Sequence, residues 1–433
     1  MTKKRVLIIT YYWPPSGGGG VQRWLKMAKY LPNYDWEPII LTPENPDFEL
    51  QDESLLKDVA SETTVLKLPI WEPFGLYRKL MGKKAVQKQG VVDTKNTSLF
   101  SRISLWIRGN WFIPDARLFW VRPSVNYAEN YLRNNPVDII ITTGPPHSMH
   151  LIGMELKRRL GVKWIADFRD PWSDWDVLTQ LNLTQKSWKR HKKLERQVMH
   201  QADKVLTVTY NLATKLATTS GINKVEVVTN GFDVEDFVFD NTIMPSSFKI
   251  SHVGLLNEGR NPAILWEVLN ELCNEDDTFN NEVEILLAGT IDQPVRDSIN
   301  RHSILVDKVN IPEYLAHNKV LELYQESAVL LLLVNDTSNS SWILPGKLFE
   351  YFSAKRPILA IGQLESEAND VLKACGYDGF LTYQNKQGLK NRIQDLFAAY
   401  QNKNERVGTD AINKFDRKKL TGEVANLLDE VIA

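Results

Sequence analysis

The sequence predicts an α/β protein built from two doubly wound domains, each with a parallel sheet covered on both faces by helices. Short apolar segments alternate with amphipathic ones along the whole chain, which is the pattern of parallel strands joined by helices. The alternation begins again after a polar stretch that ends near Ser247. A chain of 433 residues also exceeds what one ordinary core holds, so two domains are expected.

The first domain is expected to span residues 1–246. Its first strand is Arg5–Thr10, and a glycine-rich turn joins this strand to a helix in which apolar residues recur at helical spacing from Val21 to Leu31. Further strands are predicted at Pro38–Thr42, Thr64–Leu68, Asp138–Thr143, Lys163–Ala166, Lys204–Val208 and Val225–Val228.

The second domain is expected to span residues 247–412. Predicted strands are Lys249–Gly254, Val283–Gly289, Leu305–Val309, Val329–Val334 and Pro357–Ile361, with a helix over Pro262–Cys273. Residues 413–433 form a last amphipathic helix. It must pack on something, and we expect it to pack back on the first domain.

Composition and charge narrow the class of protein. Lys and Arg total 52 against 53 for Asp and Glu, so the net charge says nothing about a nucleic-acid partner. No apolar run reaches the roughly 20 residues that cross a bilayer. The only cysteines, Cys273 and Cys375, argue against a disulfide framework or a zinc site, and the amino terminus lacks the apolar length of a signal peptide. We therefore expect a cytoplasmic protein without a metal site.

The glycine-rich turn has the sequence PPSGGGGVQRW over residues 14–24. A dinucleotide fingerprint needs glycines tight against the strand, yet YYWPPS separates Thr10 from Gly17, and the third glycine of the fingerprint would fall on Gln22 or Arg23. A nicotinamide site is thus disfavoured. Consecutive glycines before a helix still offer N–H groups and a positive dipole end, so Gly18, Gly19 and Gly20 are predicted to contact an anion or a sugar. The alternative is a surface turn.

A second motif lies over residues 335–362, where Pro345 and Gly346 open a helix after the most apolar strand. Lys347 falls in the first turn of that helix, where a cation is unfavourable unless an anion is present. A bound phosphate would resolve this conflict, and Glu350, one turn further, could accept hydrogen bonds from ribose hydroxyls. The alternative is a solvent-exposed ion pair between Lys347 and Glu350.

The glycine-rich loop, the NGFD segment, a VG followed by a basic residue, and LPGKLFEYFSAKRPIL together resemble the retaining GT-B glycosyltransferases, specifically the glycosyltransferase family 4-like enzymes of bacterial surface polysaccharide assembly. This resemblance implies two Rossmann-like domains facing each other across a cleft. It implies a metal-independent enzyme that moves a sugar from a UDP- or GDP-linked donor to a glycan or lipid-linked acceptor, with retention at the anomeric carbon. No cofactor beyond the donor is implied.

The resemblance also implies roles for individual residues. Glu350 would bind the ribose, and Arg260, together with the turn from Pro345 through Gly346 to Lys347, would hold the diphosphate. Preformed cations and N–H groups suit a leaving group on which negative charge develops.

This sequence departs from the family pattern at two positions. Trp342 stands where a glutamate often contacts the donor sugar, and Leu255 stands where an arginine usually follows the glycine of the first strand. A nucleotide-sugar epimerase on the same fold, or a non-catalytic protein that binds glycans or nucleic acid, remains an alternative.

Candidate acceptor-side residues follow two neighbouring strands of the first domain. His147 and His150 begin a helix, where the neutral ring could accept or donate a hydrogen bond at a sugar hydroxyl. Asp167 and Asp170 flank Arg169 at the end of the next strand, and they either orient an acceptor or form a structural pair.

A basic and aromatic insertion is expected at about residues 71–122. Residues 76–122 hold ten basic residues against two acidic ones, interleaved with aromatic rings such as Trp106, Trp111 and Phe119. This pattern is typical of a surface that binds an anionic membrane, and it also fits single-stranded nucleic acid. With lipid-linked acceptors, we expect the inner face of the plasma membrane and no nucleic-acid partner. The alternative is a solvated hairpin with its rings in the core.

Overall fold

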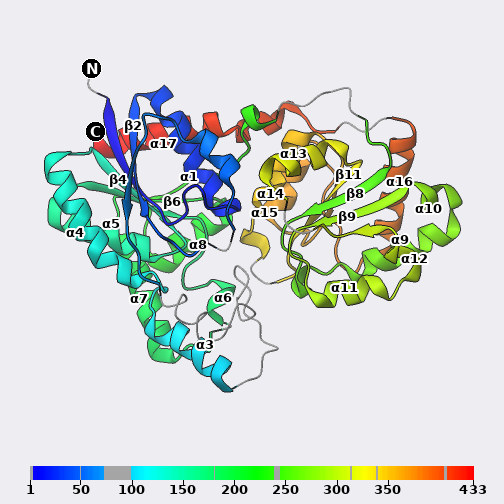
Figure 1. The fold of residues 1–433 in the computed structure, drawn as a ribbon, viewed down its shortest axis with the longest axis horizontal. Helices are drawn as coiled ribbons and strands as arrows, with labels where there is room; N and C mark the ends of the chain where they lie inside the picture. Colours follow the sequence, from blue (N-terminus) through cyan, green and yellow to red (C-terminus); the bar gives the residue numbers. More distant parts are fainter. Residues whose placement is uncertain are drawn as a thin grey trace. The chain divides into compact units, whose positions relative to one another are not determined.

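The computed structural model describes residues 3–48, 50–72, 99–179, 181–237, 244–312, 315–337, 340–403 and 407–433. The chain forms two compact units (Figure 1). The first unit comprises Met1–Thr229 and Lys418–Ala433, and the second comprises Asn230–Arg417.

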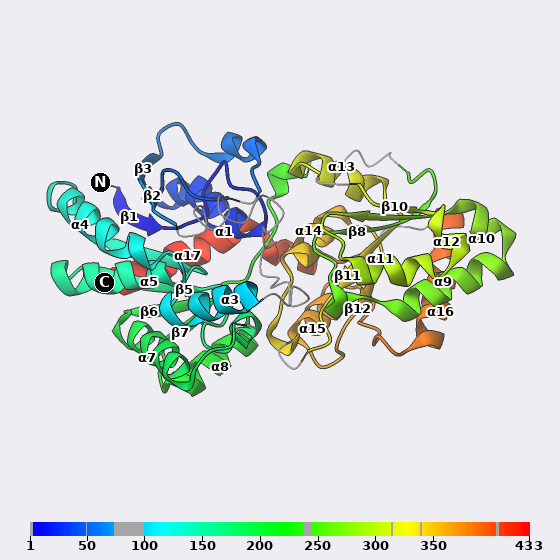
Figure 2. The ribbon, with the colours of Figure 1, turned by 60° about the horizontal axis from the view of Figure 1, so that its bottom comes forward.

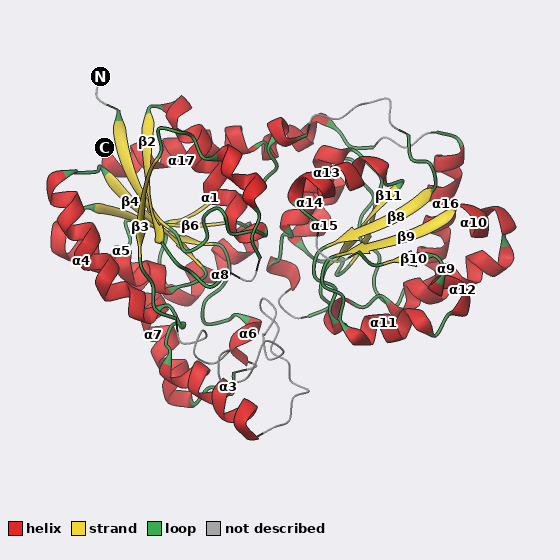
Figure 3. Cartoon of the chain, viewed as in Figure 1, coloured by secondary structure: helices red, strands yellow, loops and turns green. Residues whose placement is uncertain are grey.

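The first unit contains a seven-stranded parallel sheet in the order β3-β2-β1-β4-β5-β6-β7. Figure 3 shows its strands in yellow among helices in red. Ile8 of β1 lies beside Ile40 of β2 and Ile141 of β4, so the middle of these central strands is apolar. Such strands are expected where both faces of a sheet are covered. The strands are β1 (Lys4–Ile9), β2 (Trp36–Pro43), β3 (Thr64–Leu68), β4 (Ile139–Gly144), β5 (Lys163–Phe168), β6 (Lys204–Thr207) and β7 (Val225–Val227).

Alternating side chains of these strands build two cores, one on each face of the sheet. Val6 and Ile8 pack against α1 (Gly19–Tyr30) and α17 (Arg417–Ile432). Leu7 and Ile9 point to the other face, which is covered by α4 (Leu118–Asn134), α5 (Ser148–Leu160), α7 (Gln185–Gln201) and α8 (Tyr210–Ser220). Because successive side chains of a strand point to opposite faces of the sheet, neighbouring strand residues contact different helices.

The carboxyl-terminal helix α17 belongs to the first unit. Leu420, Val424 and Leu428 lie in the same core as α1. Asp429 accepts hydrogen bonds from Lys4 Nζ at 2.7 Å and from Trp36 Nε1 at 3.0 Å. The apolar face predicted for this segment is thus buried against the first sheet.

The second unit contains a five-stranded parallel sheet in the order β10-β9-β8-β11-β12. Its strands are β8 (Phe248–Val253), β9 (Val283–Ala288), β10 (Val309–Asn310), β11 (Val329–Leu333) and β12 (Ile358–Ile361). One face packs against α9 (Ala263–Glu275), α10 (Asp277–Glu282), α11 (Gln293–Asn300), α12 (Ser303–Val306) and α16 (Lys386–Gln401). The other face packs against α13 (His317–Glu326), α14 (Gly346–Ala354) and α15 (Glu367–Ala374), as can be followed in Figure 2.

Two expectations about element positions need correction. The segment Leu305–Val309 is not one strand: α12 takes up Ser303–Val306, and β10 is only Val309–Asn310. Residues 230–246 were expected in the first domain, but the described ones among them belong to the second unit. The physical reason is that Phe232 lies in the core of that unit with Phe415, whose carbonyl accepts from Phe232 N at 3.1 Å.

The basic insertion falls partly outside the described residues, which resume at 99. Its described part after residue 99 includes α3 (Leu99–Trp111) and the start of α4. Elsewhere in the first unit, the short helix α6 (Asp176–Thr179) follows β5. Among the described residues, no helix is long and apolar enough to cross a membrane.

Candidate functional site

Each sheet has one switch point, the place at which its strand order reverses. The reversal lies between β1 and β4 in the first unit and between β8 and β11 in the second. Ligands of open α/β sheets bind outside the carboxyl ends of the strands at such a point. The predicted site residues lie on the loops that leave these strands, on the helices that follow, or at the end of the neighbouring strand β5.

The glycine-rich turn leaves β1 and is anchored along its length. Gly17 N donates to Leu50 O at 2.9 Å, and Asp52 N donates to Pro15 O at 2.8 Å. Gly18 is the N-cap of α1 with φ of 84°, a conformation that favours glycine. No side chain caps α1 and its first turn holds no acidic residue. Gly18 and Gly19 are exposed, so this helix end can receive an anion.

Arg169 fastens the glycine-rich turn to the end of β4. Its guanidinium donates to Gly20 O at 2.7 Å, to Pro145 O at 2.6 Å and to Gly144 O at 3.3 Å. The same group lies over the ring of Tyr12, 5.9 Å from its centroid. Arg169 therefore holds a positive charge beside the glycine-rich turn and fixes the position of its backbone.

Asp167 is fully buried, and its hydrogen-bond partners all come from the first unit. Its carboxylate forms an ion pair with Arg23 at 3.3 Å and accepts from Trp24 Nε1 at 2.7 Å and Thr143 Oγ1 at 2.8 Å. Burial lowers the pKa of Arg23, and Asp167 opposes that shift. The structure thus pairs Asp167 with Arg23 from α1 and not with the neighbouring Arg169.

His147 and His150 are also buried. His147 stacks on Trp172 with ring centroids 4.9 Å apart, and His150 stacks on Phe168 at 4.5 Å. Thr142 Oγ1 lies 2.9 Å from His150 Nδ1. Burial lowers the pKa of His147 well below its ordinary value, and it lowers that of His150 to about 3. Both rings are therefore neutral at neutral pH.

The structure does not bring the four predicted catalytic residues into one cluster. Alternation along β5 places Asp167 on the face of the sheet that α1 covers, with Ile165. His150 stacks on Phe168 and His147 stacks on Trp172, and both of these rings belong to the core on the opposite face. Asp170, beyond the end of β5, is only partly buried, and its carboxylate accepts no hydrogen bond from a described residue. Burial raises its pKa, Arg169 opposes this shift and Asp167 adds to it.

In the second unit, the first turn of α14 carries the predicted diphosphate-binding residues. Pro345 is the N-cap, no side chain caps this helix, and its first turn holds no acidic residue. Gly346 is exposed, and a Cβ added there would meet nothing within 4 Å. The first N–H groups of α14 are consequently open to an anion.

Lys347 and Glu350 form an i,i+3 ion pair with Lys347 Nζ 3.1 Å from Glu350 Oε2. An ion pair between these two residues was the predicted alternative to a ribose-binding role. That alternative expected a solvent-exposed pair, whereas both side chains are partly buried. Tyr324 OH donates to the same carboxylate oxygen at 2.7 Å. Burial alone would raise the pKa of Glu350, yet Lys347, His317 and Tyr324 hold it below its ordinary value. Within the described part of the chain, Glu350 Oε1 accepts no hydrogen bond, so one oxygen of an ionised carboxylate is available to a ligand.

Arg260 lies on the loop after β8, in the short helix Glu258–Arg260. Its side chain donates to Asn335 Oδ1, beyond the end of β11, and to Leu255 O at 3.4 Å. Burial lowers the pKa of Arg260. Burial lowers the pKa of His252 to about 4, and the charges of Arg260 and Lys347 add to this shift. Lys347 Cε lies beside Gly254 and Arg260 contacts Leu255 O, so both cations lie at the carboxyl end of β8.

Glycines keep the backbone beside Lys347 clear. Gly254 has φ of 128°, and a Cβ added to it would lie 3.9 Å from Lys347 Cε. Gly289 has φ of 121°, and a Cβ there would come within 2.6 Å of Gly254 O. Of the two departures from the family pattern, Leu255 offers its carbonyl to Arg260, and Trp342 ends a short helix before α14.

Sequence reasoning missed three residues that complete these arrangements. Arg23 and Tyr324 contact predicted residues from other elements, and His252 is the buried neighbour of two predicted cations. Arg23 lies within the glycine-rich stretch 14–24 and His252 within the predicted strand Lys249–Gly254, but neither residue was given a role from the sequence.

This chain has the GT-B fold of glycosyltransferases. It contains two doubly wound sheets of parallel strands, and each sheet carries candidate ligand-binding groups at its switch point. Residues 91–236 match the family model described as Glycosyltransferase Family 4. No curated protein matches the chain.

Solved structures share the fold over nearly the full chain. A glycosyltransferase from Rickettsia africae is 14% identical with a TM-score of 0.60, covering 100% of this chain and 99% of the other. Sucrose-phosphate synthase from Thermosynechococcus elongatus is 12% identical with a TM-score of 0.67, covering 99% and 98%. A TarM variant from S. aureus, in complex with Fondaparinux, alpha-GlcNAc-glycerol and UDP, is 10% identical with a TM-score of 0.58, covering 98% and 100%. At these identities, the likeness shows the fold.

Proposed function

We propose that this protein is a glycosyltransferase that moves a sugar from a UDP- or GDP-linked donor to a glycan acceptor, with retention at the anomeric carbon and without a metal. The observation that carries the proposal is the open end of α14, where exposed Gly346 and the side chain of Lys347 adjoin a half-available Glu350 carboxylate. The family match and the UDP bound to a protein of the same fold support it.

The chemistry proposed for the donor site follows from its charges. The bond between the anomeric carbon and the phosphate oxygen breaks, and the nucleoside diphosphate leaves with the electron pair. Lys347, Arg260 and the first N–H groups of α14 stabilise the charge that develops, as preorganised cations and dipoles do. Glu350 accepts hydrogen bonds from the ribose hydroxyls. With retention, the acceptor hydroxyl attacks from the side on which the diphosphate departs, and its proton passes to the leaving phosphate.

On the acceptor side, we propose that Asp170 orients the incoming hydroxyl. Its raised pKa and its uncommitted carboxylate suit it to this role. Asp167, His147 and His150 act by positioning the strand ends, since their side chains are buried. We place Gly18, Gly19 and Gly20 against the donor phosphate or sugar, and we propose a lipid-linked acceptor at the cytoplasmic face of a membrane.

The test begins with a screen of nucleotide sugars for protection against thermal unfolding, because a bound donor stabilises the fold by mass action. The donor found is then incubated with glycan acceptors in the presence of EDTA, and the product's anomeric configuration is determined by NMR. A glycoside with the configuration of the donor is expected. Free nucleotide and an altered sugar formed without any acceptor would show an epimerase instead, and donor binding without turnover would show a non-catalytic protein.

A further inference from the structure

Helix α7 carries a cationic ridge that no other described group neutralises. Its exposed basic residues are Lys186, Lys189, Arg190, Lys192, Lys193 and Arg196, whereas Glu195, its one acidic residue, is buried. Within the described part of the chain, none of these six side chains forms an ion pair. The lysines of α16 behave differently, since Lys386 and Lys390 both pair with glutamates of α9.

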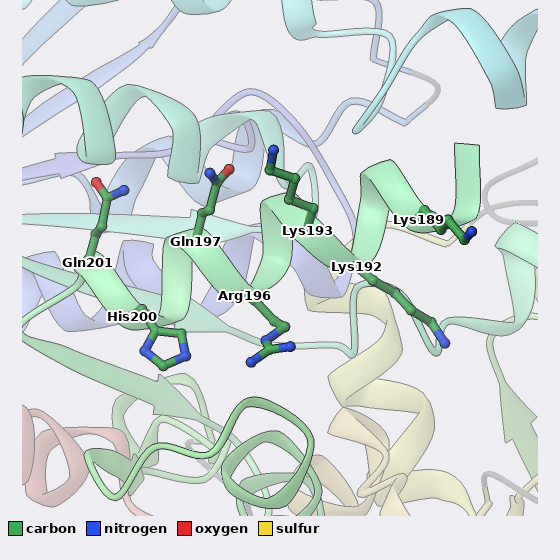
Figure 4. Close-up of a pocket in the computed structure, with 7 residues that line it drawn as sticks. All are labelled: Lys189, Lys192, Lys193, Arg196, Gln197, His200 and Gln201. Carbon is green, nitrogen blue, oxygen red and sulfur yellow. The ribbon is translucent and has the colours of Figure 1, made fainter. Parts of the chain in front are cut away.

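Four of these cations, Lys189, Lys192, Lys193 and Arg196, border a shallow, open hollow of about 560 Å³ whose lining residues all belong to α7. Lys192, Arg196 and His200 point to one side of α7, while Lys193 and the two glutamines that follow point to the other (Figure 4). Cations therefore project from both sides of α7 along about two turns of this helix.

Helix stability does not explain this charge. Lys189, Lys192, Lys193 and Arg196 are spaced at i,i+3 and i,i+4, and like charges at these spacings destabilise a helix. The opposite face holds α7 in place, because Val198 and Met199 lie in the core of the first unit. Core packing thus fixes a row of cations in a conformation that an anionic partner would favour.

Exposed aromatic rings lie on the helix that packs against the start of α7. Trp106 and Trp111 of α3 are 41% and 68% exposed. Asn110 of α3 accepts from Thr184 N at 2.8 Å, and Thr184 is the N-cap of α7. Gly109 lies so close to the preceding loop that a Cβ there would be 2.6 Å from Leu183. Direct packing therefore fixes α3, which carries the exposed rings, to the amino-terminal end of α7.

We infer that the ridge on α7 and the exposed rings of α3 form a surface that binds an anionic lipid bilayer. Basic residues attract acidic headgroups, and tryptophan rings sit at headgroup level. A nucleic-acid surface would interleave rings with cations so that bases can stack between them. Here the rings and the cations occupy separate helices, and the one tryptophan of α7, Trp188, packs against the core.

This assignment moves the membrane contact from the segment predicted from sequence to α7. Most of the basic residues expected at 76–122 fall outside the described residues, whereas its aromatic Trp106 and Trp111 form part of the proposed surface. The inference does not rest on sugar transfer, because bilayer binding is measured without donor or acceptor.

The test is flotation of the full chain with vesicles of phosphatidylcholine alone and of phosphatidylcholine mixed with phosphatidylglycerol, at low and high salt. Binding is expected only to the mixed vesicles and more weakly at high salt. In the variant K189Q/K192Q/K193Q/R196Q, we expect vesicle affinity to fall at least about tenfold, since each basic residue near an anionic surface adds to binding.

The matched control removes the same number of charges elsewhere on the first unit. In K67Q/K163Q/K418Q/K419Q, four exposed lysines are lost, and vesicle affinity should stay close to that of the wild type. The variant Trp106→Ser/Trp111→Ser should lose the binding that persists at high salt. Circular dichroism and thermal melts confirm that each variant is folded.

The inference is overturned by equal losses in the α7 variant and the control, which would indicate net charge alone. It is also overturned by failure of the wild type to bind mixed vesicles at low salt. Binding to single-stranded RNA in the absence of vesicle binding would assign the surface to nucleic acid and would equally overturn it.

Discussion

The two switch points of this protein use their polar groups in different ways. In the first unit, the carboxylate of Asp167 bonds Arg23, Trp24 and Thr143, and the guanidinium of Arg169 bonds three backbone carbonyls. In the second unit, Lys347 and Glu350 keep 35% and 19% of their side chains exposed beside an uncapped helix end.

The same strand topology therefore fixes the loops in the first unit and leaves groups open to a ligand in the second. Groups that satisfy one another inside the protein fix the loops at the strand ends, because breaking any such buried contact is costly. Groups left partly open keep hydrogen-bonding capacity for a ligand. We therefore expect substitutions at the first switch point to reduce stability and substitutions at the second to reduce nucleotide affinity.

The largest effect is expected from Asp167→Ala. The variant leaves the guanidinium of Arg23 buried without its carboxylate, which should lower the free energy of unfolding by about 3–5 kcal/mol. Urea denaturation followed by fluorescence measures this change. The control is Asp174→Ala, which removes a half-exposed partner of Lys215 and should cost less than about 1 kcal/mol. Similar losses in both variants would contradict a structural role for Asp167.

A pair of glycine substitutions compares the space at the two switch points. In Gly144→Ala, the added Cβ would lie 2.6 Å from His150 Nε2 and 2.9 Å from His147 Nδ1. Overpacking of this kind should cost about 1–3 kcal/mol. In Gly346→Ala the new methyl group meets open space, and the free energy of unfolding should change by less than about 0.5 kcal/mol. Thermal melts of both variants measure the two losses of stability. A Gly144→Ala protein as stable as the wild type would contradict the tight packing of Gly144 against the two histidines.

The buried histidines give the fold a pH dependence. The pKa of His150 is lowered from 6.5 to about 3, so at intermediate pH the unfolded chain binds a proton that the folded chain does not. The contribution of His150 to the free energy of unfolding is therefore fully present above pH 6.5, and it is lost as the pH decreases towards 3. The slope is at most about 1.4 kcal/mol per pH unit for one histidine.

His150→Asn removes this contribution. Between pH 6 and 4, urea unfolding of the variant should show a shallower loss of stability than the wild type, by about 1 kcal/mol per pH unit. Above pH 7 the two slopes should agree. Parallel curves at all pH values would mean that the imidazole of His150 titrates alike in the folded and unfolded chain.

Local sequence patterns predicted most of the fold but not the pairing of site residues. Strands such as β4 and β11 are apolar runs between helical segments, so their positions follow from neighbouring residues alone. The contacts of Asp167 with Arg23 and of Glu350 with Tyr324 join different elements, and no spacing in the chain encodes them. The segment Leu305–Val309 was mistaken for a strand because a short buried helix and a strand have the same apolar composition.

Contacts between site residues could be predicted within one helix but not between different elements. Lys347 and Glu350 lie within one helical turn, so their proximity could be derived from sequence. The separation of Asp167 from His147 and His150 depends on which sheet face each strand residue points to. That face became known only from the two cores of the first unit.

The central claim is that the second switch point holds a nucleoside diphosphate. Calorimetric titration of UDP and GDP into the wild type, Lys347→Ala and Glu350→Ala tests it directly. We expect binding of at least one nucleotide and an affinity about 10 to 100 times lower in both variants, because hydrogen bonds to charged groups are worth about 1.5–3 kcal/mol. The matched control is Lys319→Ala/Glu322→Ala, an exposed i,i+3 ion pair of α13 in the same unit, which should bind like the wild type. Unchanged affinity in Lys347→Ala and Glu350→Ala would contradict the account.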